Sequence, residues 1–62
     1  MTHYTIKAFA HERMDPVEEI MALAHDDAAV DAGRGLLRRR KTVHQVEVWR
    51  DARRIATVER VV

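Results

Sequence analysis

Hydrophobic and polar residues alternate most regularly over residues 42–61, where the β-forming side chains Val, Ile, Thr and Trp are concentrated. An Asp-Ala pair at positions 51 and 52 interrupts this pattern where a tight turn is expected. With this pair as the turn, Val48 is predicted to lie opposite Ile55. The segment therefore predicts an antiparallel hairpin, and its apolar face requires more strands and a helix to cover it.

A second alternating segment lies near the start of the chain, over residues 3–10. Tyr4 and Ile6 fall on one face of an extended chain and Phe9 on the other, which predicts another strand. The following residues 11–15 are polar and end in Asp-Pro, a sequence that favours a turn.

Residues 17–24 fit two structures. The preceding Asp-Pro and the glutamate at position 18 have the form of a capping box, and the apolar residues fall at helical spacing. A continuous helix from Pro16 would, however, cross the acidic pair Asp26-Asp27, which has the character of a helix start. We therefore expect residues 17–24 to form a strand, and a β-α-β-β order with a long helix from Pro16 is the alternative.

The segment Asp26–Arg39 is predicted to form the main helix. It begins with acidic residues that would supply the N-terminal cap and ends with basic ones, and both signs suit the helix dipole. Its apolar stripe is rich in small residues and includes Gly33, which would let the helix approach a sheet closely. The expected fold is thus a single α+β domain over residues 1–62, with β-β-α-β-β order and one helix packed on one face of an antiparallel sheet.

Several short motifs carry a resemblance. They are YTIKAF at residues 4–9, DDAAV at 26–30 with RGLL at 34–37, VEVW at 46–49, and RIATV at 54–58. Together they resemble a group of short proteobacterial proteins of unknown function, with a Tyr-x-Ile-x-x-Phe strand, an Asp-Asp-Ala-Ala helix start and a Val-Glu-Val-Trp hairpin. The resemblance implies that residues 17–24 are a strand, and it implies no activity. The chain departs from the group at Ala52, where glycine is usual, and in its longer basic segment after the helix.

Charge is distributed unevenly although the net charge is only +1. Residues 1–31 carry seven acidic and two basic residues, whereas residues 32–62 carry nine basic and three acidic ones. Such halves can attract each other within one chain or across a dimer, or the basic half can contact nucleic acid. We favour attraction between the halves.

The chain lacks the residues that many catalytic mechanisms require. There is no cysteine and no serine, which excludes disulfides, thiolate chemistry and a serine nucleophile. The four histidines lack the spacing of a helical metal site, and the Gly-Arg-Gly at residues 33–35 lies inside the predicted helix. Glu18 and Glu19 would point to opposite faces of a strand. We therefore expect no catalytic residues, no metal, no cofactor and no enzyme activity.

Self-association is the expected function. A chain of this length buries only about 60% of the surface that its unfolded form exposes, so an additional interface would add useful burial. We expect Phe9, Trp49 and Val58 to lie on the sheet face that the helix leaves open, and to form the interface of a homodimer or of a protein-interaction module.

A nucleic-acid-binding module is the alternative. Its contacts would come from the basic segment after the helix and from the arginines near the hairpin turn: Arg38, Arg39, Arg40, Lys41, Arg50, Arg53 and Arg54. No apolar run is long enough for a signal peptide or a membrane span, so we expect no membrane partner and a cytoplasmic location.

Overall fold

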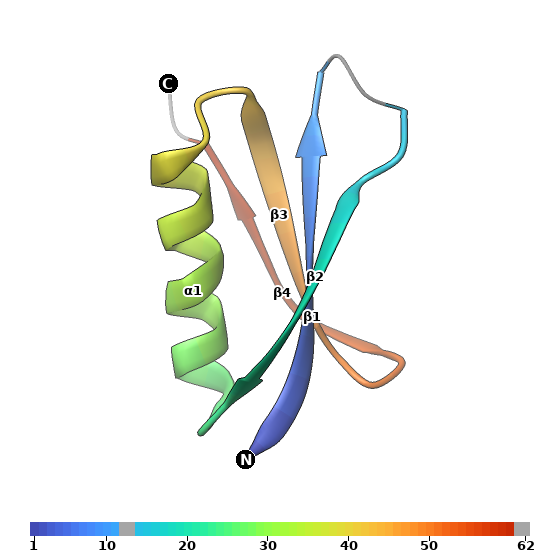
Figure 1. Ribbon diagram of the computed structural model, residues 1–62, viewed down its shortest axis with the longest axis vertical. Helices are drawn as coiled ribbons and strands as arrows, with labels where there is room; N and C mark the ends of the chain where they lie inside the picture. Colours follow the sequence, from blue (N-terminus) through green and yellow to red (C-terminus); the bar gives the residue numbers. More distant parts are fainter. Residues whose placement is uncertain (12–13, 61–62) are drawn as a thin grey trace.

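The elements follow one another in the order β-β-α-β-β, as the sequence predicts (Figure 1). The structure is a computed structural model that describes residues 1–11 and 14–60. Its elements are β1 (Thr2–Ala10), β2 (Val17–Leu23), α1 (Asp26–Arg39), β3 (Val43–Arg50) and β4 (Arg53–Glu59). The predicted strand in residues 17–24 is confirmed, and the alternative of a long helix from Pro16 is wrong.

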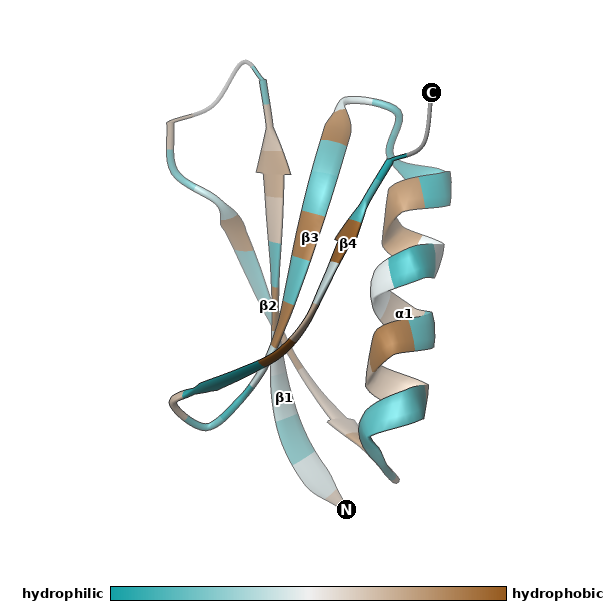
Figure 2. Ribbon diagram, turned by 180° about the vertical axis from the view of Figure 1, so that it is seen from behind, coloured by the Kyte–Doolittle hydropathy of each residue, from teal (hydrophilic) through white to brown (hydrophobic). Residues whose placement is uncertain are grey.

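The four strands form one antiparallel sheet in the order β2-β1-β3-β4, so β2 and β4 are its two edges. The helix α1 covers one face and packs mainly against β3 and β4 (Figure 1). Figure 2 shows hydrophobic and hydrophilic bands alternating along β3, the pattern of a strand with one covered and one open face. The strand β2 makes few contacts with the helix, and none of its residues is buried.

The core lies between α1 and the two central strands. Its buried members are Tyr4, Ile6, Ala8, Ala29, Leu36, Leu37, Val43, Val46 and Val48. The helix approaches most closely at Gly33, where a Cβ atom would lie 3.2 Å from Val46 Cγ1 and 3.3 Å from Val48 Cγ2. The small residue at position 33 thus sets the distance between helix and sheet. At Gly35 none of the described residues comes within 4 Å of the corresponding position, so its lack of a side chain serves no packing purpose there.

The hairpin of β3 and β4 has a register that differs from the prediction. Arg50 pairs with Arg53 across the turn, but Val48 pairs with Ala56 and not with Ile55. A bulge at Ile55 causes this shift, because one extra residue in β4 reverses which face the following residues occupy. The turn itself contains Asp51 with φ 55°, in the left-handed region that aspartate tolerates better than most residues.

The two ends of α1 are held by His25 and by Arg60. The N-cap is His25, whose Nδ1 accepts a hydrogen bond from the backbone N–H of Ala28 at 3.2 Å. The prediction that Asp26 and Asp27 form the cap is therefore wrong, although both lie in the first turn and suit the dipole. At the other end, the guanidinium of Arg60 donates to the carbonyl oxygens of Leu37 and Arg40, so the chain after β4 is joined to the end of the helix.

Candidate interaction surface

The face of the sheet opposite α1 is predominantly polar. The strand register places residues in rows across this face, and one row runs from Glu18 through Lys7 and Glu47 to Thr57. The three charged side chains of this row alternate in sign, which favours their cross-strand neighbours. A face of this composition is typical of a sheet that one helix covers on one side and water covers on the other.

Trp49 is held within this polar face by three neighbours. Lys7 Nζ lies 4.4 Å from the ring centroid, a distance at which cation and ring attract each other. Trp49 Nε1 donates to Glu47 Oε1 at 3.0 Å, and Arg54 donates to Glu47 Oε2 at 3.2 Å. The Glu47 side chain is only 14% exposed within this group. Packing a second protein against Trp49 would further desolvate these charges, and that lowers the gain from such an interface.

The expected interface residues do not form one patch. Phe9 and Trp49 both lie on the open face and are half-buried, but the row containing Lys7 and Glu47 separates them. Val58 pairs with Val46 and packs against the core under α1, so its predicted place on the open face is wrong. The bulge at Ile55 is the reason, since it turns Val58 toward the helix.

Among the helix and the four strands, the edge strand β2 is the element that has exposed large apolar side chains. Ile20 is 71% exposed on the open face, and Val17 is 41% exposed on the helix side. Both lie in a strand whose outer edge has no neighbouring strand among the described residues. The sequence pattern did not show this surface, because the apolar spacing of β2 resembles that of an amphipathic helix and gives no strand face.

A hollow of about 180 Å3 lies between β2 and the end of α1. Its apolar walls include Ala8, Val17 and Leu36, while Glu19 and Arg40 contribute charge. The hollow lies where the contacts of α1 with the sheet are few, since α1 packs mainly on β3 and β4. The strand β2 is therefore incompletely covered on both faces as well as at its edge.

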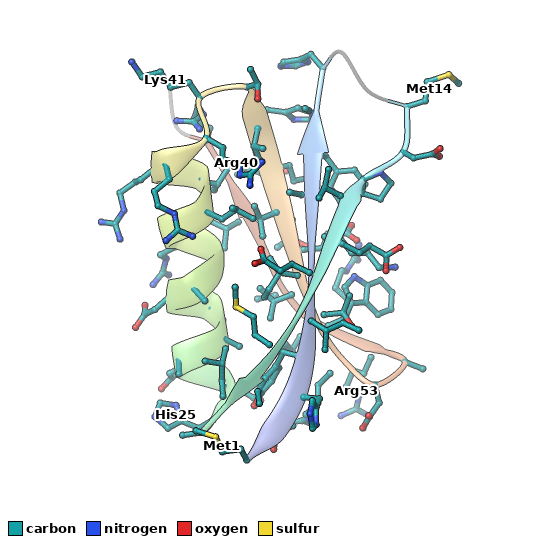
Figure 3. The ribbon with its side chains drawn as sticks, in the orientation of Figure 1. Met1, Met14, His25, Arg40, Lys41 and Arg53 are labelled. Atoms are coloured by element: carbon teal, nitrogen blue, oxygen red, sulfur yellow. The ribbon has the colours of Figure 1, made fainter. Side chains whose placement is uncertain are left out.

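The basic residues of the nucleic-acid alternative lie at two separate ends of the molecule. Arg40 and Lys41 are at one end and Arg53 is at the other (Figure 3), and the longest dimension is 32 Å. Arg38, Arg39, Arg40 and Lys41 are exposed. Arg50 and Arg54 are engaged, the first with Asp26 and the second with Glu47. The predicted contacts therefore do not share one surface.

A cluster that the sequence did not predict joins the start of α1 to the sheet. The Tyr4 hydroxyl donates to Asp26 Oδ1 at 2.7 Å, and the Arg50 guanidinium donates to both oxygens of Asp26 at 2.8 and 2.9 Å. The hydrogen bond from Tyr4, with the positive charge of Arg50, lowers the pKa of the Asp26 carboxyl, although partial burial opposes this. The same hydrogen bond, then burial, raises the pKa of the Tyr4 hydroxyl. The three groups satisfy one another, so the cluster fixes structure.

The histidines are distributed over the molecule, with one close pair. His11 and His44 stack with ring centroids 4.1 Å apart and an angle of 18° between the ring planes. His25 caps the helix, and His3 lies in β1. Among the residues that the structure describes, no three His, Asp or Glu side chains are grouped so that they could hold a metal ion.

The chain matches no protein-family model, no curated protein and no solved structure. The resemblance to short proteobacterial proteins consequently stays a prediction. Over residues 1–11 and 14–60, no helix has the length and apolar character needed to cross a membrane.

Proposed function

We propose that the chain is a non-catalytic interaction module that forms a homodimer, and that its interface is the edge strand β2. The observation that carries the proposal is the exposure of Ile20 and Val17 on an edge beside which the described part of the chain places no further strand. Unpaired N–H and C=O groups along such an edge are ready to pair with another strand, and exposed apolar side chains beside them add burial.

The size of the chain supports self-association. A domain of 62 residues buries about 60% of the surface exposed by its unfolded chain, which leaves it with a thin margin of stability. Burial of about 25 cal/mol per Å2 of apolar surface at an interface adds directly to that margin. A dimer through β2 would use a strand with which α1 makes few contacts.

The hollow beside β2 is small for a substrate site. Its volume of about 180 Å3 is below the ~300–1,000 Å3 typical of small-molecule sites. Glu19 and Arg40 are its charged members. Side chains that carry chemistry elsewhere in the fold, such as Asp26 and Tyr4, are engaged with each other.

Sedimentation velocity at several protein concentrations tests the proposal. We expect the wild type to be a dimer at micromolar concentrations and Ile20→Lys to raise the dissociation constant at least about thirtyfold, the effect of losing ~2 kcal/mol at an interface. Thr57→Lys is the matched control, because Thr57 is also exposed on the open face but belongs to β4. A wild type that remains monomeric at high micromolar concentration would contradict the proposal.

A further inference from the structure

We infer that the two copies pair β2 with β2 in antiparallel orientation, with Ile20 on the two-fold axis. This inference rests on the proposed homodimer and specifies its geometry. The two four-stranded sheets would become one continuous sheet of eight strands, with both helices on the same face. Continuous sheets of this kind are a common consequence of strand addition at an open edge.

The choice of edge follows from the difference between β2 and β4. The strand β4 contains the bulge at Ile55, and Arg53 and Arg54 are exposed near its start. Bulges and charged side chains are features that oppose pairing at a sheet edge, and β2 has two charged residues, Glu18 and Glu19, but no bulge. In contrast, β2 pairs with β1 over its whole length, from Leu23 with Thr2 to Val17 with Ala8, without a shift of register. Its outer edge is therefore regular and suited to another strand.

Symmetry restricts how two β2 strands can pair. A two-fold axis perpendicular to the sheet relates the two copies so that each residue has its side chain on the same face in both. Residues that face each other directly across an antiparallel pair also have their side chains on the same face. These conditions are met only when a residue, and not a peptide bond, lies on the axis. Ile20 is the middle residue of β2, so placing it on the axis pairs all seven residues of the strand.

The Ile20 register places no two like charges opposite each other. Its facing pairs are Ile20 with Ile20 of the second copy, Val17 with Leu23, Glu18 with Ala22, and Glu19 with Met21. Each glutamate faces an apolar residue, and the exposed Ile20 and Val17 both face apolar ones. Directly opposed side chains on one face of an antiparallel pair contact each other, and directly opposed like charges destabilise the pair.

The two neighbouring registers are less favourable. With Glu19 on the axis, two carboxylates would face each other and Pro16, which has no N–H to donate, would enter the ladder. With Met21 on the axis, the pairing within β2 would shorten to residues 19–23, and Val17 would lie outside it. The Ile20 register alone among the three uses the full strand without opposing its charges.

This geometry leaves the open face of both sheets in water. The polar group around Trp49 would keep its present contacts, because Trp49 lies on β3, two strands away from the new interface. The side chain of Val17, which forms part of the hollow, would pack against Leu23 of the second copy. The inferred dimer therefore covers β2 without desolvating Lys7, Glu47 or Arg54.

Cysteine cross-linking tests the register, since the natural chain has no cysteine and each variant carries one thiol. Directly opposed residues in antiparallel strands have Cα atoms about 4.5–5.5 Å apart, which suits a disulfide. We expect Ile20→Cys to form a covalent dimer under mild oxidation at least tenfold faster than Glu19→Cys or Met21→Cys. Their equivalent Cα atoms would be separated by roughly 8 Å or more, too far for a bridge without movement of the backbone.

Two further variants complete the test. Trp49→Cys reports on stacking of the open faces, and Arg39→Cys, at an exposed position near the end of α1, reports on random collision; both are expected to cross-link slowly. Fastest cross-linking of Glu19→Cys or Met21→Cys would overturn the register, and fastest cross-linking of Trp49→Cys would overturn the edge-strand geometry while the protein remains a dimer. A monomeric wild type in sedimentation would instead overturn the proposed function itself, so the two failures are distinguishable.

Discussion

The hydroxyl of Tyr4 donates a hydrogen bond of 2.7 Å to Asp26 Oδ1, and this contact joins the first strand to the first turn of the helix. The two residues are 22 positions apart in the sequence. Arg50, at the end of β3, binds the same carboxylate. The start of α1 is thus fixed to both central strands through one charged group.

The Asp26 carboxyl predicts sensitivity to acid. Because the folded state lowers its pKa, the carboxyl stabilises the fold above its ordinary pKa of about 4, and this contribution is lost as the pH falls through the lower folded pKa. We expect the urea concentration at the unfolding midpoint of the wild type to decrease as the pH is lowered below about 4. The midpoint of Asp26→Asn should change less with pH. Urea unfolding between pH 2 and 7 measures both. Asp27→Asn, an exposed neighbour in the same turn, is the control and should retain the wild-type pH dependence.

The Tyr4 hydroxyl predicts the opposite dependence at alkaline pH. Its pKa is raised in the folded state, so its contribution to stability is complete below its ordinary pKa of about 10 and is lost as the pH rises through the folded pKa. Tyr4 is the only tyrosine, so the absorbance of tyrosinate reports on this residue alone. We expect its titration midpoint above 10 in the wild type and closer to 10 in Asp26→Ala, provided circular dichroism shows that the variant is folded. An unchanged midpoint in Asp26→Ala would contradict the assigned cause.

The two glycines of α1 predict opposite responses to alanine. Gly35→Ala should raise the free energy of unfolding by up to about 1 kcal/mol, because alanine favours helix and no atom of residues 1–11 or 14–60 lies within 4 Å of the added atom. Gly33→Ala has the same helix preference but forces its Cβ against the stiff side chains of Val46 and Val48, an overpacking that typically costs 1–3 kcal/mol. We expect Gly33→Ala to melt several degrees below the wild type and Gly35→Ala above it. Equal melting temperatures for the two variants would show that the helix can move away from β3.

Substitutions at the two residues of the hairpin turn, Asp51 and Ala52, are expected to affect stability differently. Asp51 has φ 55°, so Asp51→Ala should lower the free energy of unfolding by about 1 kcal/mol, whereas Asp51→Gly relieves the backbone at no steric cost. Among the described residues other than glycine, Asp51 alone has a positive φ, so Ala52→Gly gains no such relief and should destabilise by a few tenths to about 1 kcal/mol. Thermal unfolding of the three variants tests this order. A stabilising Ala52→Gly would contradict it.

The fold class could be predicted from the sequence because its local signals agree. Alternation defined β1 and the hairpin, and the acidic pair at positions 26 and 27 separated β2 from α1. The details that failed depend on contacts between distant residues. Asp26 has the character of a cap, but Tyr4 and Arg50 engage its carboxylate and the neighbouring His25 caps the helix instead.

The candidate site could be predicted only in part for a similar reason. A hairpin without a bulge is the simplest interpretation of residues 42–61, and it places Val58 on the open face. The bulge at Ile55 is decided by packing, since it allows Ile55 and Val58 both to contact the core. The exposure of β2 was also not visible in the sequence, because it depends on where α1 lies across the sheet. The sequence shows which residues are apolar, but the position of the helix across the sheet determines which of them remain exposed.

The last prediction separates folding from association with two substitutions on the open face. Trp49→Ala removes the ring that contacts Lys7 and the N–H that donates to Glu47, so we expect it to lower the free energy of unfolding by about 1–3 kcal/mol. It should leave the dissociation constant of the dimer within about threefold of the wild type, since Trp49 lies two strands from β2.

Ile20→Ala should do the reverse. Ile20 is 71% exposed in the single chain, so its truncation should change the free energy of unfolding of the monomer by less than about 0.5 kcal/mol. At the centre of the inferred interface, the same truncation should weaken the dimer by tenfold or more. Unfolding followed by circular dichroism, at a protein concentration well below the dissociation constant, gives the free energy of unfolding of the monomer. Sedimentation at higher protein concentration gives the dissociation constant of the dimer. If Trp49→Ala dissociates the dimer and Ile20→Ala does not, the interface lies on the open face of the sheet and not at the edge of β2.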